Sequence, residues 1–258
     1  MRLHTETSGN GPDLVLLHGW GMNAAVWSPV VDALSRDYRI TLVELPGHGA
    51  SAYDPHCAGL DDWVDACLGA APARAVWIGW SLGGQLALRA ALRAPRRVSA
   101  LVLVTASPRF VMGEGWPHAM APATLTQFAR ALRRDHHQTL ERFLSLQVQG
   151  DEAARETLRL LRQDIAQRPE ADPLALEHGL ELLRTVDLRP GLGDLRCPTL
   201  WLLGERDTLV PADLGDELER LMPAAEILIL QGCAHAPFLS HPRQCLRALN
   251  HFLGSDHA

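Results

Sequence analysis

Residues 75–84 read Ala-Val-Trp-Ile-Gly-Trp-Ser-Leu-Gly-Gly, an apolar run that ends in a Gly-x-Ser-x-Gly pentapeptide. A helical pattern rich in Ala and Leu follows, over residues 82–94. A serine on a sharp strand-to-helix turn faces outward, and the flanking glycines allow the close backbone approach that the turn needs. The N-terminus of the following helix favours negative charge at that point. The pattern therefore predicts that Ser81 is a nucleophile whose reaction passes through an oxyanion.

Short apolar runs on both sides of this stretch predict the other strands of one sheet. The runs are continuous rather than alternating, which is typical of strands buried on both faces and of a mostly parallel sheet covered by helices. The predicted strands span residues 14–17, 40–44, 75–78, 99–105, 199–203 and 226–230, and the predicted helices span 24–35, 60–68, 82–94, 214–221 and 242–252. A chain of 258 residues is long enough for one such α/β domain.

Residues 108–187 have a different character, because they contain no convincing strand. Four amphipathic helices are predicted there, at residues 122–134, 138–149, 151–168 and 173–185. An insertion of this length between two strands of one sheet favours a helical cap over a doubly wound α/β core, with residues 1–107 and 188–258 forming the core. A separate helical domain is the alternative.

Composition and charge exclude several classes of function. A formal net charge of −6 argues against general nucleic-acid binding, which needs a basic face. No apolar run of signal-peptide length opens the sequence, and none approaches the roughly 20 residues of a membrane span. Five scattered cysteines form neither a disulfide framework nor a metal-ligand spacing. We expect a cytoplasmic monomer with reduced thiols, without metal, cofactor or membrane contact.

A serine nucleophile needs a base to take its proton and an acid to orient that base. His235 lies in the turn after the predicted strand 226–230, and open parallel sheets place their chemistry at the carboxyl ends of strands. Asp207 follows the predicted strand 199–203 in the same way, with Glu205 as its rival. The order Ser81, Asp207, His235 along the chain is the order of the α/β-hydrolase class.

An oxyanion hole is also predicted. In this class one donor is the backbone N–H after the nucleophile, here Leu82, and the second lies in a loop after an early strand, here Trp20. His18 precedes that loop and is expected to brace it, although a tight strand exit alone would also explain the His-Gly pair at 18–19.

These residues carry a resemblance to α/β-hydrolase carboxylesterases with a helical cap. More narrowly, the chain resembles the pimeloyl-[acyl-carrier protein] methyl ester esterases of biotin synthesis. The matching stretches are residues 14–21, 78–84, 141–147, 183–189 and 234–242. The stretches at 141–147 and 183–189 are the more specific ones, since the others suit many hydrolases.

The resemblance implies the same triad and adds binding residues. The residues implied to line the acyl pocket are Trp20, Leu82, Phe143, Leu144, Ser145, Leu146, Gln147 and His235. Those implied to meet an acidic acyl carrier protein are Arg142, Arg155 and Arg159. The chain departs from the family pattern at Gln138, because the family has a basic residue at this position. Without the resemblance, these arginines also fit a solvated surface with ion pairs to nearby carboxylates.

The function predicted is hydrolysis of a pimeloyl methyl ester on acyl carrier protein through an acyl-enzyme. A broad short-chain carboxylesterase without a carrier partner is the alternative within the same chemistry, which also serves thioester and C–C bond hydrolysis. A non-catalytic ligand receptor on the same fold is a remote second class.

Overall fold

A seven-stranded sheet with the order β1-β3-β2-β4-β5-β6-β7 forms the centre of the molecule. The structure is a computed structural model and describes residues 1–254. The strands are β1 (Thr5–Ser8), β2 (Asp13–Leu17), β3 (Arg39–Val43), β4 (Ala75–Trp80), β5 (Val98–Val104), β6 (Thr199–Gly204) and β7 (Glu226–Leu230). Only β1 is antiparallel to its neighbour, so the predicted mostly parallel sheet is confirmed.

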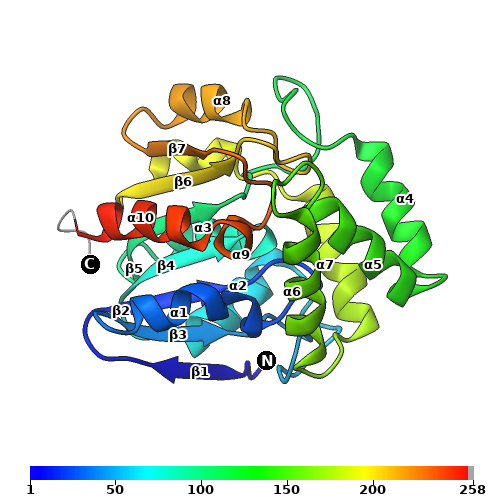
Figure 1. The fold of residues 1–258 in the computed structure, drawn as a ribbon, viewed down its shortest axis with the longest axis horizontal. Helices are drawn as coiled ribbons and strands as arrows, with labels where there is room; N and C mark the ends of the chain where they lie inside the picture. Colours follow the sequence, from blue (N-terminus) through cyan, green and yellow to red (C-terminus); the bar gives the residue numbers. More distant parts are fainter. Residues whose placement is uncertain (255–258) are drawn as a thin grey trace.

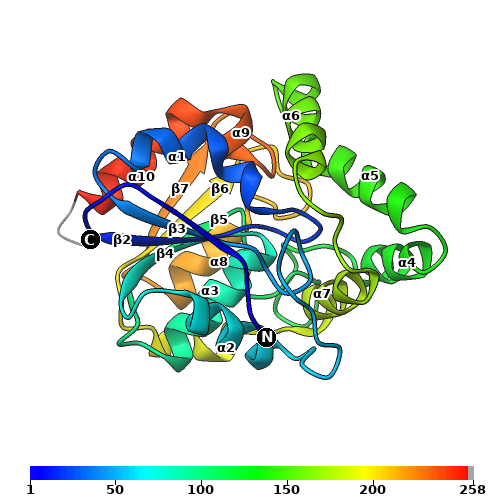
Figure 2. The same ribbon diagram turned by 90° about the horizontal axis from the view of Figure 1, so that it is seen from below.

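Helices cover both faces of the sheet (Figure 2). One face carries α1 (Ser28–Leu34), α9 (Pro237–Ser240) and α10 (Pro242–Leu253), and the other carries α2 (Leu60–Ala70), α3 (Leu82–Arg93) and α8 (Leu214–Leu221). Alternate residues of β2 enter the two cores: Leu14 and Leu16 join one cluster, Val15 and Leu17 the other. Burial on both faces therefore explains why the strand sequences are continuously apolar.

Four helices lie between β5 and β6 in the chain and gather beside one end of the sheet (Figure 1). They are α4 (Pro122–Leu132), α5 (His136–Gln147), α6 (Ala154–Ala166) and α7 (Pro173–Thr185), followed by the short 3-10 helix η2 (Arg189–Asp194). They stand over the loop after β2, where Trp20 Nε1 donates to the carbonyl of Leu176 at 2.8 Å. We refer to residues 108–187 as the helical insertion.

The observed elements differ from the predicted ones in several places. The structure adds β1, whose polar sequence Thr-Glu-Thr-Ser carries no apolar pattern. The helix predicted at 24–35 is a 3-10 turn, η1 (Ala24–Trp27), followed by α1 with Pro29 in its first turn. The edge strand β7 is not buried on both faces, because Leu228 and Ile229 are each 43% exposed.

Within the described part of the chain, no helix combines the length and the apolar character that crossing a bilayer requires. All five cysteines are free thiols.

The turn between β4 and α3 is built from close backbone contacts. Ser81 has φ 54° and ψ −117°, a conformation that L residues rarely adopt. A Cβ added to Gly79 would lie 2.4 Å from the carbonyl oxygen of Gly83, and one added to Gly83 would lie 2.4 Å from that of His18. Only glycine fits at these positions, which keeps Ser81 on the turn and brings α3 against the end of β2.

Two buried histidines brace the loop after β2. The backbone N–H of Leu45 donates to Nε2 of His18 at 3.0 Å, and that of Gly21 donates to Nε2 of His48 at 3.2 Å. Each Nδ1 faces a carbonyl oxygen, that of Gly19 at 2.8 Å and that of Pro46 at 2.9 Å. Nε2 can accept these bonds only when it carries no proton, so both rings are neutral.

Burial lowers the pKa of His18 to about 3, with His48 as a second cause, and lowers the pKa of His48 to about 4. The expected brace at His18 is present. The role of His48 was not predicted, because its Pro-Gly-His-Gly segment reads as an ordinary turn.

Replacing Gly83 with alanine should lower the free energy of unfolding by about 1–3 kcal/mol, because the new methyl group would overlap backbone atoms that cannot move away. Chemical denaturation of the Gly83→Ala variant measures this. Gly69→Ala is the matched control, since nothing lies within 4 Å of a Cβ at this position of α2. The control should instead gain up to about 1 kcal/mol. Equal stabilities of the two variants would contradict the packing argument.

The two neutral histidines should make the protein less stable in acid. Their pKa values are lower in the folded state than the unfolded value of about 6.5. Their stabilising contribution is therefore complete above pH 6.5 and declines as the pH falls toward 4, since only the unfolded chain then takes up the protons. Each histidine adds a slope of up to about 1.4 kcal/mol per pH unit. Replacing His48 with glutamine should flatten the measured dependence of unfolding free energy on pH, and an unchanged slope would show that His48 is not buried in its neutral form.

Candidate active site

Ser81 lies at the N-terminus of α3, directly after β4, and its side chain is buried. The loop after β2 packs against it, because a Cβ built on Gly19 would lie 3.3 Å from the Cβ of Ser81. The start of α3 and the loop after β2 therefore both lie close to Ser81. The sequence motifs predict a nucleophile and its oxyanion donors at this place, and these roles remain predictions.

His235 and Asp207 form a buried pair. Nδ1 of His235 and Oδ2 of Asp207 are 2.7 Å apart, and Oδ1 of Asp207 accepts the backbone N–H groups of Leu209 at 2.8 Å and Val210 at 3.0 Å. Both carboxylate oxygens are thus occupied, which fixes the carboxylate and directs the Nδ1 proton toward it. Nε2 of His235 is left buried and has no hydrogen-bond partner in the described residues.

Ser81 and His235 are connected through Trp80. Trp80 Nε1 donates to the carbonyl oxygen of His235 at 2.7 Å, and the two rings have centroids 5.8 Å apart. Thr105, directly after β5, donates to the same carbonyl at 2.7 Å. No hydrogen bond joins the Ser81 hydroxyl to Nε2 in this structure. In sites without substrate such bonds are often long and tighten only when substrate binds.

Glu205, the rival candidate for the acid, lies elsewhere. Its Oε2 accepts the backbone N–H of Gly232 at 2.8 Å, and the side chain is partly exposed beside Arg206. It therefore supports the loop that carries His235 without contacting the imidazole.

The two predicted oxyanion donors carry free N–H groups. Neither the backbone N–H of Trp20 nor that of Leu82 makes a hydrogen bond to any residue in the range 1–254. Trp20 is fully buried, and its indole packs edge-on against Phe143 with ring centroids 4.9 Å apart. Unpaired N–H donors of this kind can bind a carbonyl oxygen or an oxyanion.

The segment 143–147 does not present all its side chains to the same place. Phe143 joins Trp20 and Leu82 in one apolar cluster, and Leu146 packs against it. Leu144 belongs to the opposite cluster, and the Ser145 hydroxyl is exposed and donates to the carbonyl of Glu141 at 3.0 Å. The periodicity of α5 explains the split, because consecutive residues on a helix point about 100° apart.

Gln147 is buried, and neither polar atom of its side-chain amide has a partner in the described residues. Its backbone carbonyl accepts the N–H of His235 at 3.0 Å. A buried amide without partners lies next to the candidate base, and such groups are normally satisfied by a ligand or by water.

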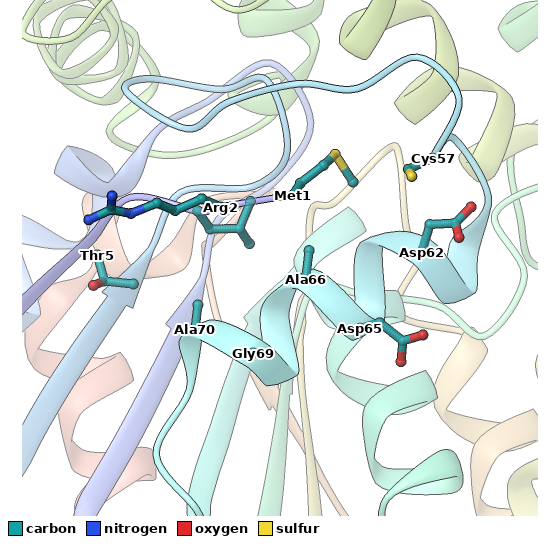
Figure 3. A pocket seen from close by; sticks show the side chains of 10 residues that line it. Met1, Arg2, Thr5, Cys57, Asp62, Asp65, Ala66, Gly69 and Ala70 are labelled. Atoms are coloured by element: carbon teal, nitrogen blue, oxygen red, sulfur yellow. The ribbon is translucent and has the colours of Figure 1, made fainter.

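Two cavities lie outside this cluster. One of about 690 Å³ separates the first residues of the chain from α2 and is lined by none of the predicted site residues (Figure 3). The other, of about 580 Å³, is an open groove between α4, α5 and the start of α6. Its lining includes Phe128, Arg142, Leu146 and Val148. We call it the outer groove.

The three arginines implied as carrier contacts differ in their surroundings. Arg142 and Arg155 are exposed and form no ion pair with residues 1–254, and Arg142 lines the outer groove. Arg159 is paired with Glu156 one helical turn earlier and hydrogen-bonds Gln163 at 2.7 Å. The alternative of a solvated ion-pair surface therefore describes Arg159 and does not describe the other two.

Comparison with known proteins gives the family. Residues 12–242 match the family model of the alpha/beta hydrolase fold. The pimeloyl-[acyl-carrier protein] methyl ester esterases of Nitrosomonas europaea and Stenotrophomonas maltophilia are each 45% identical, over 96% and 98% of this chain and 99% and 97% of their own. That of Vibrio vulnificus is 43% identical over 98% of both chains.

Solved structures agree in fold. An esterase from Exiguobacterium antarcticum superposes with a TM-score of 0.88 at 21% identity, covering 98% of this chain and 96% of its own. A bromoperoxidase from Bacillus anthracis superposes with a TM-score of 0.87 at 24% identity, covering 98% and 95%. At these identities the likeness shows the fold alone. The family-model match and the sequence identities together establish that the chain belongs to the alpha/beta hydrolase family, with the pimeloyl-[acyl-carrier protein] methyl ester esterases.

Proposed function

We propose that the protein is a serine carboxylesterase that hydrolyses the methyl ester of a pimeloyl group held on acyl carrier protein, a reaction of biotin synthesis. The observation that carries this proposal is the buried His235–Asp207 pair at 2.7 Å, in which Nε2 of His235 has no partner, held by Trp80 directly before the strained turn of Ser81. The level of identity to esterases that are named for this substrate supports the choice of ester.

In the proposed reaction, Oγ of Ser81 attacks the ester carbonyl while Nε2 of His235 takes the hydroxyl proton. The tetrahedral intermediate collapses, the C–O bond to the alcohol breaks, and His235 gives the proton to the departing methanol. Water then attacks the acyl-enzyme with His235 again as the base, and the carboxylic acid leaves as Ser81 recovers its proton. Asp207 keeps the imidazole in the Nδ1–H form and stabilises its positive charge.

The free N–H groups of Trp20 and Leu82 are proposed to bind the oxyanion. Fixed donors in a water-excluded site need no reorganisation as charge develops, and losing one such donor typically lowers kcat by about 10²–10³-fold. The hydrogen bond from the N–H of Gly21 to Nε2 of His48 holds the loop that contains Trp20 in place.

For the acyl chain we propose the apolar cluster of Trp20, Leu82 and Phe143, with Leu146 at its edge. The unpartnered amide of Gln147 is suited to a polar group of the substrate. Leu144 and Ser145 are left out of this proposal, because their side chains lie in the opposite core and on the surface.

We propose that the helical insertion, residues 108–187, acts as a cap over an α/β core of residues 1–107 and 188–258. Ser81, His235 and Asp207 are all buried, and the segment 147–151 of the insertion binds the backbone next to His235, which supports this proposal. The outer groove is the proposed approach for a long carrier arm, because it combines apolar walls with an unpaired arginine, Arg142.

Arg142 and Arg155 are the proposed contacts to the acidic carrier protein. Both are exposed cations that no carboxylate of the described residues neutralises, whereas Arg159 has Glu156. Exposed charges of this kind mainly steer association.

Replacing Ser81 with alanine should leave the fold intact and lower hydrolysis of a small chromogenic ester by on the order of 10⁴–10⁶-fold. A serine-directed phosphonate should modify the wild-type protein once, at Ser81, as read by peptide mass spectrometry. Substantial turnover by the variant would rule out the proposed mechanism, and no turnover by the wild type would favour a ligand receptor.

Replacing Asp207 with asparagine should cost about 10⁴-fold, since the amide would favour the wrong imidazole tautomer. Glu205→Gln is the matched control, because Glu205 contacts the same loop without touching the ring. Steady-state kinetics on one ester decide between them, and a larger loss in the Glu205 variant would reassign the acid.

Reversing Arg142 and Arg155 to glutamate should lower kcat/KM for the carrier-bound methyl ester, most strongly at low salt, and leave a free methyl ester nearly unaffected. The charges act over a Debye length of about 8–10 Å and are screened beyond it. The control reverses Arg36 and Arg247, exposed residues at the other end of the fold without ion pairs in the described chain, which gives the same change in net charge. Equal rates on the carrier-bound ester for the wild type, the Arg142 and Arg155 variant and the control variant would favour a broad small-ester carboxylesterase.

A further inference from the structure

The loop that carries His235 is held from two sides. We define the histidine loop as residues 232–235. Two of its carbonyl groups bind the α/β core: that of Cys233 accepts the N–H of Arg206 at 2.8 Å, and that of His235 accepts Trp80 Nε1 and the Thr105 hydroxyl, each at 2.7 Å. Its N–H groups at Ala234 and His235 point the other way, toward the helical insertion.

The partners on that side come from one short segment between α5 and the start of α6. Asp151 Oδ2 accepts the N–H of Ala234 at 2.9 Å, and the carbonyl of Gln147 accepts the N–H of His235 at 3.0 Å. The N–H of Glu152 donates to the carbonyl of Gly232 at 3.2 Å. The segment 147–152 therefore holds the histidine loop on the side opposite the α/β core.

Asp151 is the only side chain among these three contacts from the insertion. It is 7% exposed, and its second oxygen, Oδ1, accepts the N–H of Ala153 at 2.7 Å, just before α6. One carboxylate thus ties the beginning of α6 to the residue that precedes the candidate base. Each of its two oxygens receives one N–H donor, which a carboxylate can satisfy and a neutral amide cannot.

We propose that Asp151 is a positioning residue, which aligns His235 for proton transfer by holding the histidine loop against the seated insertion. The proposal rests on the catalytic role proposed above for His235. Its consequence is that the base is fully aligned only when the segment 147–152 is in place, so that seating of the insertion and competence for catalysis occur together. A misplacement of a reacting group by about 1 Å can cost on the order of 10²-fold in rate.

The test replaces Asp151 with asparagine in the full-length protein and measures hydrolysis of a small free ester. The amide has one acceptor for two N–H donors, so either Ala153 or Ala234 loses its partner. We expect kcat to fall by on the order of 10²-fold with KM changed little, because the change affects alignment of the base and leaves the proposed acyl pocket intact. Asp151→Ser is a second variant, whose shorter side chain can still accept the N–H of Ala153 but cannot span both donors.

Asp172→Asn is the matched control. Asp172 caps α7 in the same insertion, with Oδ1 accepting the N–H groups of Leu174 at 2.8 Å and Ala175 at 3.2 Å, and it does not contact the histidine loop. Asparagine caps a helix as well as aspartate does. This variant should keep wild-type kcat, and a loss equal to that of Asp151→Asn would overturn the proposal by showing a general effect of replacing a carboxylate that accepts backbone N–H groups in the insertion.

Proton NMR of the phosphonate adduct separates positioning from stability. The resonance of the proton between His235 and Asp207 should shift or broaden in both Asp151 variants and stay unchanged in Asp172→Asn. Unchanged kcat and an unchanged resonance in the Asp151 variants would overturn the inference while leaving the triad intact. Failure of the triad itself would appear separately, as retained activity in Ser81→Ala.

Discussion

Close backbone packing around Ser81 is the constraint on which the rest of the site depends. A Cβ on Gly79 or Gly83 would overlap a carbonyl oxygen, that of Gly83 or that of His18. Because glycine has no Cβ, β4, α3 and the end of β2 can meet at contact distance. Gly19 then lies against Ser81, and Trp80 reaches the carbonyl of His235. A single crowded turn thereby brings together Ser81, the loop after β2 and the backbone of His235, which come from three separate parts of the chain and are proposed to act as nucleophile, oxyanion hole and base.

Much of the fold could be predicted because buried strands are recognisable in the sequence as runs of apolar residues. The five internal strands are largely buried and mostly apolar, whereas of the two edge strands β1 is polar and β7 is half exposed. The order Ser81, Asp207, His235 was also predictable, since each residue follows a strand and the carboxyl ends of parallel strands share one edge. The pairing of Asp207 with His235, and the placement of Glu205 on Gly232, agree with that reading.

The partners that hold the site in place could not be predicted. Trp80 reads as one more apolar strand residue, and Thr105 as the end of a strand, yet both bind the carbonyl of His235. Every residue has a backbone carbonyl, so the residue type at position 147 does not indicate that its carbonyl accepts the N–H of His235. Helix periodicity likewise hides which residues of 143–147 face inward until the rotation of α5 is known. These contacts join positions far apart in sequence, and no local pattern encodes them.

The two-sided support of the histidine loop has an evolutionary consequence. Insertions on this fold are often regarded as exchangeable modules that set substrate range while the core keeps the chemistry. Here the insertion supplies acceptors for the N–H groups of Ala234 and His235. A transplanted insertion would bring its own acceptors, in its own positions, to these two N–H groups. Exchange of the insertion is therefore expected to displace the loop that carries His235 as well as to change the surface that the insertion presents.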